Sequence, residues 1–129
     1  MSIGITELNH VNVTVPKSAE EASKQFYGSV LGLREIPKPE GSRVGVGAWY
    51  QLDGVQLHLS VEDGVGDNNA SRRHVCLMVV NLAHAEQQLS GAGFEILPDE
   101  RPVVGWLRFY VRDPGGNLIE IAQDPAQGI

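Results

Sequence analysis

The chain has 129 residues and carries 10 Lys and Arg against 16 Asp and Glu, which gives a formal net charge of −6. This length fits one compact domain or two small modules. The negative charge, with no basic cluster longer than Arg72-Arg73, argues against a nucleic-acid partner. No apolar run approaches the roughly 18 residues of a membrane span, and no signal-peptide pattern opens the sequence. We therefore expect a soluble, cytoplasmic protein with no membrane partner.

The first predicted elements are a strand and a helix. Residues 8–15 alternate valines with polar side chains, which predicts a strand with one buried face. Ser18 and Glu21 have the spacing of a capping box, and apolar residues then recur at helical spacing as far as Gly32. This pattern predicts a helix directly after the strand.

A loop and two strands complete the first half. Residues 37–47 are rich in Gly and Pro and predict a loop. Strands are predicted at 49–52 and 55–61, on either side of the turn Asp53-Gly54. Residues 63–71 show no apolar period, which is typical of a linker.

The same order of elements then begins again. Residues 74–79 alternate like the first strand, and Asn81 predicts the N-cap of a second helix that ends near Gly91. His84 lies off the apolar stripe of this helix and is expected in solvent. Further strands are predicted at 94–97, 106–112 and 117–122, with a turn at 113–116 before the last.

Each half therefore contains a strand, a helix and about three strands, which is an internal repeat. We predict an α+β fold and a single domain, 1–129, built from two modules at 5–62 and 72–123 with a linker at 63–71. The helix covers one face of each sheet, and the uncovered faces are expected to meet around a cleft.

The repeat also places side chains that could bind a metal. The single cysteine excludes an internal disulfide and a cysteine-rich zinc site. Any bound metal would therefore have histidine and carboxylate ligands. His10 and His74 open equivalent strands and lie on their polar faces. Glu120 lies on the polar face of the last strand. These three side chains are therefore candidate metal ligands.

A fourth ligand depends on how the halves are aligned. Matching Gly54 with Gly116 pairs His58 with Glu120, whereas an equal residue count from the two strand-opening histidines pairs Gln56 with Glu120. We prefer His58, because the glycines fix the register of the hairpin. Three histidines and a glutamate suit zinc, nickel, manganese, iron or cobalt and leave positions open for water or substrate.

The strand predicted at 106–112 supplies candidate substrate-binding residues. Its apolar side chains should face the helices, which leaves Trp106, Arg108, Tyr110 and Arg112 toward the cleft or solvent. Arg108 suits a carboxylate or phosphonate, and Tyr110 can donate a hydrogen bond to a substrate oxygen.

Five motifs occur along the chain: Asn9-His10-Val11, Phe26-Tyr27, Val30-Leu31-Gly32-Leu33, Asp113-Pro114-Gly115-Gly116-Asn117 and Leu118-Ile119-Glu120-Ile121. Together they resemble the vicinal oxygen chelate superfamily, which includes glyoxalase I, fosfomycin-resistance thiol transferases, extradiol dioxygenases and bleomycin-binding proteins. The resemblance covers about residues 5–123. It implies paired βαβββ modules that form a curved mixed sheet around a metal-binding cleft, and a homodimer whose site often draws ligands from both chains. It also implies metal ligation at His10, His58, His74 and Glu120.

The resemblance implies a small divalent-metal-dependent enzyme of the glyoxalase or fosfomycin-resistance type. It would be a lyase, isomerase or thiol transferase that binds an oxygen-rich small molecule or an electrophilic toxin such as an antibiotic. Glu120 is the candidate catalytic residue, as a general base or as a plain metal ligand. Two alternatives stay open. One is a metal-free drug-binding protein of the bleomycin-resistance type, and the other is an extradiol-type dioxygenase with His10, His74 and Glu120 as ligands.

Overall fold

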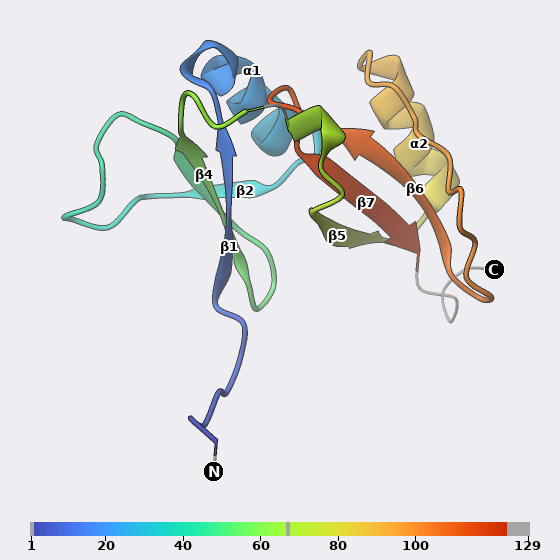
Figure 1. The fold of residues 1–129 in the computed structure, drawn as a ribbon, viewed down its shortest axis with the longest axis horizontal. Coiled ribbons are helices and arrows are strands. Elements are labelled where there is room, and N and C mark those ends of the chain that lie inside the picture. The colour runs from blue at the N-terminus through green and yellow to red at the C-terminus, as the bar shows by residue number, and fades with distance from the viewer. Residues whose placement is uncertain (1, 67, 124–129) are drawn as a thin grey trace. The chain divides into compact units, whose positions relative to one another are not determined.

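The computed structural model describes residues 2–66 and 68–123 (Figure 1). The chain divides into two compact units, Met1–Asp63 and Gly64–Ile129. Each unit combines a mixed sheet with a helix, which confirms the α+β prediction. None of the helices in the described ranges is both long and apolar enough to span a bilayer.

Unit 1 contains a four-stranded sheet in the order β1-β4-β3-β2. Strand β1 runs parallel to β4, whereas the β2–β3 and β3–β4 pairs are antiparallel. The helical segment between β1 and β2 consists of a 3₁₀ turn, helix α1 and a π-helical turn. The strands are β1 (His10–Val15), β2 (Arg34–Ile36), β3 (Ala48–Gln51) and β4 (Gln56–Val61), and the helical pieces are Lys17–Ala19, α1 (Glu20–Gln25) and Phe26–Val30.

The core of unit 1 lies between this helical segment and one face of the sheet. Phe26 and Tyr27 are fully buried and meet edge to face, with ring centroids 5.0 Å apart. The strands supply the other buried apolar side chains, which are Val15, Ala48, Tyr50, Leu57 and Leu59. The opposite face of β1 exposes His10 and Asn12, as the alternation predicts.

The start of the helix differs from the predicted capping box. Ser18 lies within the 3₁₀ turn, and no side chain caps α1. Glu20, rather than Glu21, turns inward. Its carboxylate accepts a hydrogen bond from the backbone N–H of Gly47 at 2.7 Å and pairs with Lys17 Nζ at 2.5 Å. A long-range partner therefore decides which glutamate is buried, and a local motif cannot reveal it.

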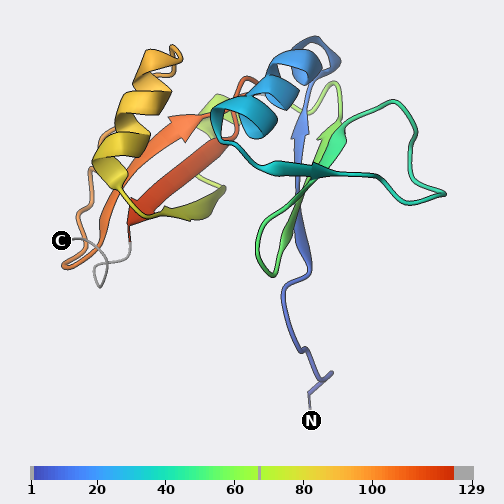
Figure 2. The same ribbon diagram turned by 180° about the vertical axis from the view of Figure 1, so that it is seen from behind.

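Unit 2 contains a three-stranded sheet in the order β5-β7-β6, with β5 parallel to β7 and β6 antiparallel to it. Figure 2 shows α2 lying along one face of this sheet. A 3₁₀ turn at Asn68–Ala70 precedes β5. The elements are β5 (His74–Val79), α2 (Leu82–Gly91), β6 (Leu107–Arg112) and β7 (Leu118–Gln123).

Helix α2 forms as predicted. The Asn81 side chain accepts a hydrogen bond from the backbone N–H of His84 at 2.9 Å, so it caps the helix, and Leu89 is buried against the sheet. The Gln123 side chain also accepts a hydrogen bond, from the backbone N–H of Leu82 at 2.6 Å, which attaches the start of the helix to β7. The His84 side chain is exposed, as expected.

Two expectations for unit 2 were wrong. The strand at 94–97 is reduced to a single bridge between Leu97 and Tyr110, because Pro98 follows and has no N–H to extend the ladder. Leu107, expected against the helix, is 53% exposed because it is the first residue of β6 at the end of the sheet.

Candidate functional site

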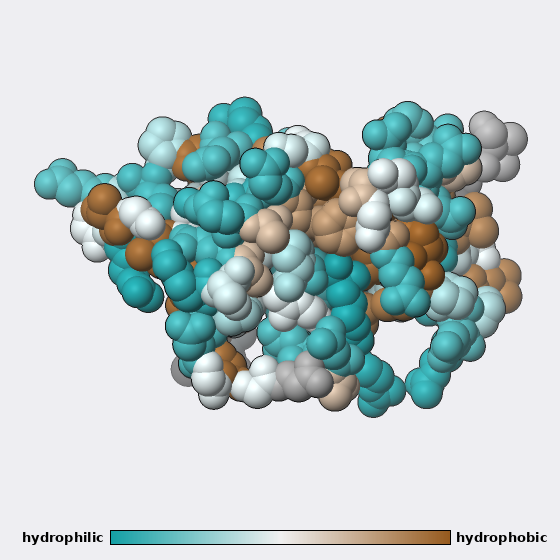
Figure 3. Space-filling view, turned by 90° about the horizontal axis from the view of Figure 1, so that it is seen from above, coloured by the Kyte–Doolittle hydropathy of each residue, from teal (hydrophilic) through white to brown (hydrophobic). Residues whose placement is uncertain are grey.

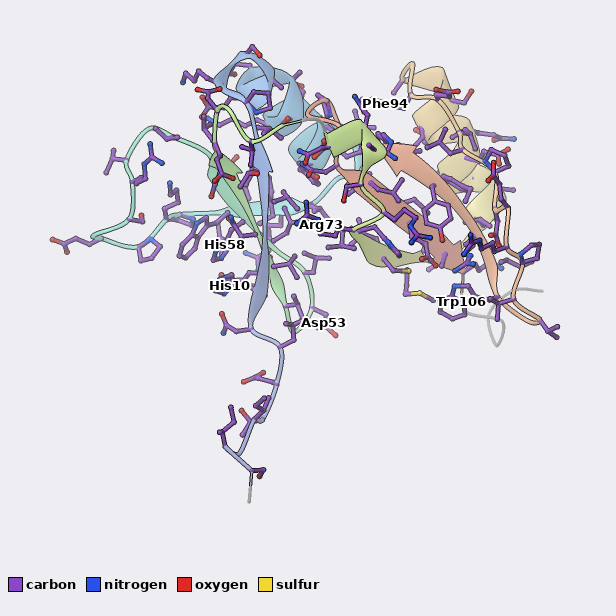
Figure 4. The ribbon with its side chains drawn as sticks, viewed as in Figure 1. His10, Asp53, His58, Arg73, Phe94 and Trp106 are labelled. Atoms are coloured by element: carbon purple, nitrogen blue, oxygen red, sulfur yellow. The ribbon has the colours of Figure 1, made fainter. Side chains whose placement is uncertain are left out.

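The structure brings the predicted ligands together as two pairs, one in each unit. His10 and His58 lie side by side on β1 and β4 (Figure 4), with ring centroids 4.2 Å apart. His74 and Glu120 meet on β5 and β7 at 3.1 Å. Within residues 2–66 and 68–123, no group of three or more His, Cys, Asp or Glu side chains is placed to hold one ion.

The register of the two sheets distinguishes His58 from Gln56. His58 lies opposite Asn12, two residues after the histidine that opens β1. Glu120 lies opposite Cys76, two residues after the histidine that opens β5. His58 is therefore the structural counterpart of Glu120, and Gln56 is not.

Hydrogen bonding to a backbone carbonyl places a hydrogen on His74 Nδ1 and orients the ring toward Glu120. His74 Nδ1 lies 2.8 Å from the carbonyl oxygen of Arg72, which only accepts, so Nδ1 carries a hydrogen. In the neutral ring, Nε2 then holds a lone pair and faces Glu120 Oε1 at 3.1 Å. Two acceptors this close require a cation, either a proton on Nε2 or a metal ion. Neighbouring ligand atoms bound at about 2.0–2.2 Å lie about 3 Å apart, so the spacing fits a divalent metal.

Glu120 is 4% exposed, and its second carboxylate oxygen is also occupied. The Trp106 indole N–H donates to Oε2 at 2.8 Å, and Arg108 Nη1 lies 3.5 Å away. Burial raises the pKa of Glu120, but the hydrogen bonds from Trp106 and Cys76 and the charge of Arg108 outweigh burial and lower that pKa below its ordinary value. The group is therefore a carboxylate at neutral pH.

Cys76 shares the parity of His74 and lies opposite Glu120 in the register of β5 and β7, so it is exposed beside the pair rather than packed in the core. Burial, and then the adjacent Glu120 carboxylate, raise the pKa of the Cys76 thiol to about 11. The thiol stays protonated at neutral pH and donates a hydrogen bond to Glu120. It therefore supports the carboxylate and is not a nucleophile in this state.

An open pocket of about 630 Å³ lies beside His74, within the size range of about 300–1,000 Å³ typical of small-molecule sites. Of the four side chains expected toward the cleft or solvent, Arg108 and Tyr110 line this pocket, whereas Trp106 and Arg112 are not among its lining residues. Arg108 Nε donates to Asp99 at 3.0 Å, and Nη2 donates to the Arg101 carbonyl at 2.9 Å, so the guanidinium holds one pocket wall. The lining residues are Arg72, His74, Leu97, Pro98, Asp99, Glu100, Arg101, Arg108, Tyr110 and Leu118.

Arg112 has a different role from its neighbours on β6. Its Nη1 donates to the carbonyls of Asn68 at 3.1 Å and Gly116 at 2.9 Å. The side chain thus ties the 3₁₀ turn to the turn before β7, and its guanidinium is used within unit 2.

The unit 1 pair belongs to a stack of three rings. Trp49 lies on His58 with centroids 3.8 Å apart, and His10 stacks on the other side. His58 Nε2 donates to Gln56 Oε1 at 2.9 Å, because the Gln56 amide N–H is directed to Gln51. His58 Nδ1 therefore keeps a lone pair. Burial, followed by the charges of His10 and Lys38, lowers the pKa of His58, so its ring is neutral at neutral pH.

Comparison with known proteins gives consistent results. Residues 7–121 match the model of the Glyoxalase/Bleomycin resistance protein/Dioxygenase superfamily. A glyoxalase family protein from Bacillus anthracis is 35% identical, with a TM-score of 0.83 over 96% of this chain and 99% of that one. No curated protein matches the chain significantly.

Two further solved structures share the fold. Lactoylglutathione lyase from Agrobacterium tumefaciens is 19% identical, with a TM-score of 0.71 over 98% of this chain and 99% of that one. The fosfomycin resistance protein FosX from Listeria monocytogenes is 15% identical, with a TM-score of 0.75 over 98% and 94% of the respective chains.

Proposed function

Because the chain belongs to the glyoxalase/bleomycin resistance/dioxygenase superfamily, we propose that it is a small divalent-metal-dependent enzyme of the glyoxalase or fosfomycin-resistance type. It would act as a lyase, isomerase or thiol transferase on an oxygen-rich small molecule or an electrophilic toxin. The proposed metal ligands are His10, His58, His74 and Glu120. Zinc, nickel, manganese, iron and cobalt suit this set.

The observation that carries this proposal is the contact between His74 Nε2 and Glu120 Oε1. Both atoms are acceptors when the imidazole is neutral, and they lie 3.1 Å apart. Glu120 is ionised despite its burial, and His74 is oriented by a backbone carbonyl in the manner of a metal-ligating histidine. The unit 1 pair adds two imidazoles at repeat-equivalent positions.

The pocket beside His74 supplies the substrate side of the proposal. A bound divalent ion would act as a Lewis acid toward substrate oxygens. Arg108 would hold a carboxylate or phosphonate with the N–H groups that Asp99 and Arg101 leave unused, and Tyr110 would donate a hydrogen bond. Trp106 would approach the substrate from the side of Glu120. Glu120 is ionised and would accept a proton as general base.

Metal analysis of the purified protein tests the proposal. We expect about one divalent ion per chain, as a single four-ligand site requires. Substitution of each proposed ligand by Ala should sharply lower the occupancy, most of all His74→Ala and Glu120→Ala. His84→Ala is the matched control, because this exposed helix residue should leave the occupancy unchanged.

The opposite outcome is equally defined. Metal-free wild-type protein that shows no thermal shift with zinc, nickel or manganese would overturn the proposal. It would favour a metal-free drug-binding protein, for which the stack of Trp49, His58 and His10 offers a flat aromatic surface.

A further inference from the structure

We infer that Trp106 is a positioning residue that orients the Glu120 carboxylate toward His74. This inference rests on the proposed metal site, and it concerns how the ligand is held rather than whether a metal binds. Trp106 donates a hydrogen bond directly to Glu120, but it does not line the pocket described for unit 2.

Of the hydrogen bonds that Trp106 and Arg108 donate to Glu120 Oε2, the one from Trp106 is shorter. The indole N–H lies 2.8 Å from Glu120 Oε2, whereas Arg108 Nη1 lies 3.5 Å from the same atom. Arg108 is also committed to Asp99 and to the carbonyl of Arg101. Trp106 is therefore the main partner that fixes Oε2, and this leaves Oε1 directed at His74.

The indole itself is held in place by the backbone. Trp106 donates its backbone N–H to the carbonyl of Val103 at 2.9 Å, which closes a tight turn. Gly105 in this turn has φ +77°, a conformation that glycine adopts without strain. The side chain is thus presented from a fixed point just before β6.

An indole suits this role for a chemical reason. Its N–H is a donor only and carries no charge, so it holds one carboxylate oxygen without neutralising the ligand. A cationic donor in the same place would weaken the carboxylate as a partner for a divalent ion.

The first test compares cobalt binding by the full chain with and without Trp106→Phe, which keeps an aromatic ring and removes the donor. We expect cobalt affinity to fall by about 10- to 100-fold, the usual effect of losing a partner of a metal ligand. The visible absorption of bound cobalt should also change. Leu107→Ala is the control, because this exposed neighbour should leave affinity unchanged.

A double-mutant cycle shows whether Trp106 acts through Glu120. In the Glu120→Ala background, Trp106→Phe should cause no further loss of cobalt affinity. Wild-type affinity in Trp106→Phe, or an equal loss in both backgrounds, would overturn the inference. A wild-type chain that binds no metal would instead overturn the proposed function, and the inference with it.

A second measurement needs no Trp106 variant. The chain has two tryptophans, so two indole N–H signals are expected in an NMR spectrum of the metal-free protein. Glu120→Ala should shift the Trp106 signal and leave the Trp49 signal in place. An unmoved Trp106 signal would contradict the bond on which the inference depends.

Discussion

Two buried glutamates show how surroundings assign different roles to one residue type. Glu20 is 3% exposed and is bound by Lys17 and by the N–H of Gly47. Glu120 is 4% exposed, and its bonds come from neutral donors and His74, with Arg108 more distant. Glu20 therefore stabilises the fold, whereas Glu120 is the carboxylate that we propose as a metal ligand.

Replacing Glu20 by Gln should destabilise unit 1. The ion pair with Lys17 is lost and the hydrogen bond from the Gly47 N–H keeps only a neutral acceptor, whereas hydrogen bonds to charged groups contribute about 1.5–3 kcal/mol. We expect a loss of about 1–3 kcal/mol in the free energy of unfolding at neutral pH, measured by urea denaturation. Glu21→Gln is the control, because the Glu21 side chain is 88% exposed.

The same carboxylate gives unit 1 an acid sensitivity. The Lys17 hydrogen bond first, and then the Gly47 N–H, hold the pKa of Glu20 below its ordinary value of 4.5. The stabilisation is therefore fully present above about pH 4.5 and is lost as the pH falls through the lowered pKa of the folded state. The wild-type melting temperature should drop more steeply in acid than that of Glu20→Gln. Parallel curves would contradict this assignment.

At the scale of elements, a single glycine, Gly47, holds the loop before β3 close against β4. Gly47 has φ +71°, and a Cβ added there would lie 2.0 Å from the carbonyl oxygen of Leu59 in β4. The close approach lets the Gly47 N–H reach Glu20. Only a residue without a side chain fits this contact between the loop and the sheet.

Gly47→Ala should therefore disrupt the pairing of β3 with β4 in the middle of the unit 1 sheet. We expect a loss of about 2–5 kcal/mol, from left-handed backbone strain and from the clash with β4. Gly45→Ala is the matched control, because Gly45 has a similar φ of +76° but no atom lies within 4 Å of an added Cβ. It should cost only about 1–2 kcal/mol. Equal melting temperatures for the two variants would contradict the close contact.

At the scale of the whole molecule, the internal repeat gives each unit the same plan. The first strand runs parallel to the last, and the preceding strand runs antiparallel to it. The family match confirms the resemblance seen in the motifs. Hydrophobic side chains also reach the surface in patches among hydrophilic ones (Figure 3). Those exposed by half or more include Ile3, Ile5, Leu8, Val44, Val65, Met78, Val80, Val103, Val104 and Leu107.

These exposed side chains and the family resemblance lead us to expect a homodimer. Light scattering should give about twice the mass of one chain, as for the commonest symmetric oligomer.

We further expect ligands from both chains to form each metal site. A variant lacking His10 and His58, mixed and refolded with one lacking His74 and Glu120, should then regain metal. Continued loss in the mixture would assign each site to a single chain.

The sequence by itself determined the elements and the faces on which candidate ligands lie. Strand alternation and helix capping are local properties, so β1, β5 and α2 follow from the residues within them. The repeat likewise placed His10 and His74 at equivalent strand starts. The strand expected at 94–97 is reduced to one bridge because Pro98 follows it, so a single residue can change what a local pattern predicts.

The tertiary structure decided which side chains meet. His58 rather than Gln56 stands opposite Asn12 because strand register is set between strands, not along one. Trp106 reaches Glu120 from the turn just before β6, and Glu20 finds its partner at Gly47, 27 residues away. Periodicity specifies the face on which a side chain lies. Its hydrogen-bond partner depends on how distant segments come together, and only the folded chain fixes that.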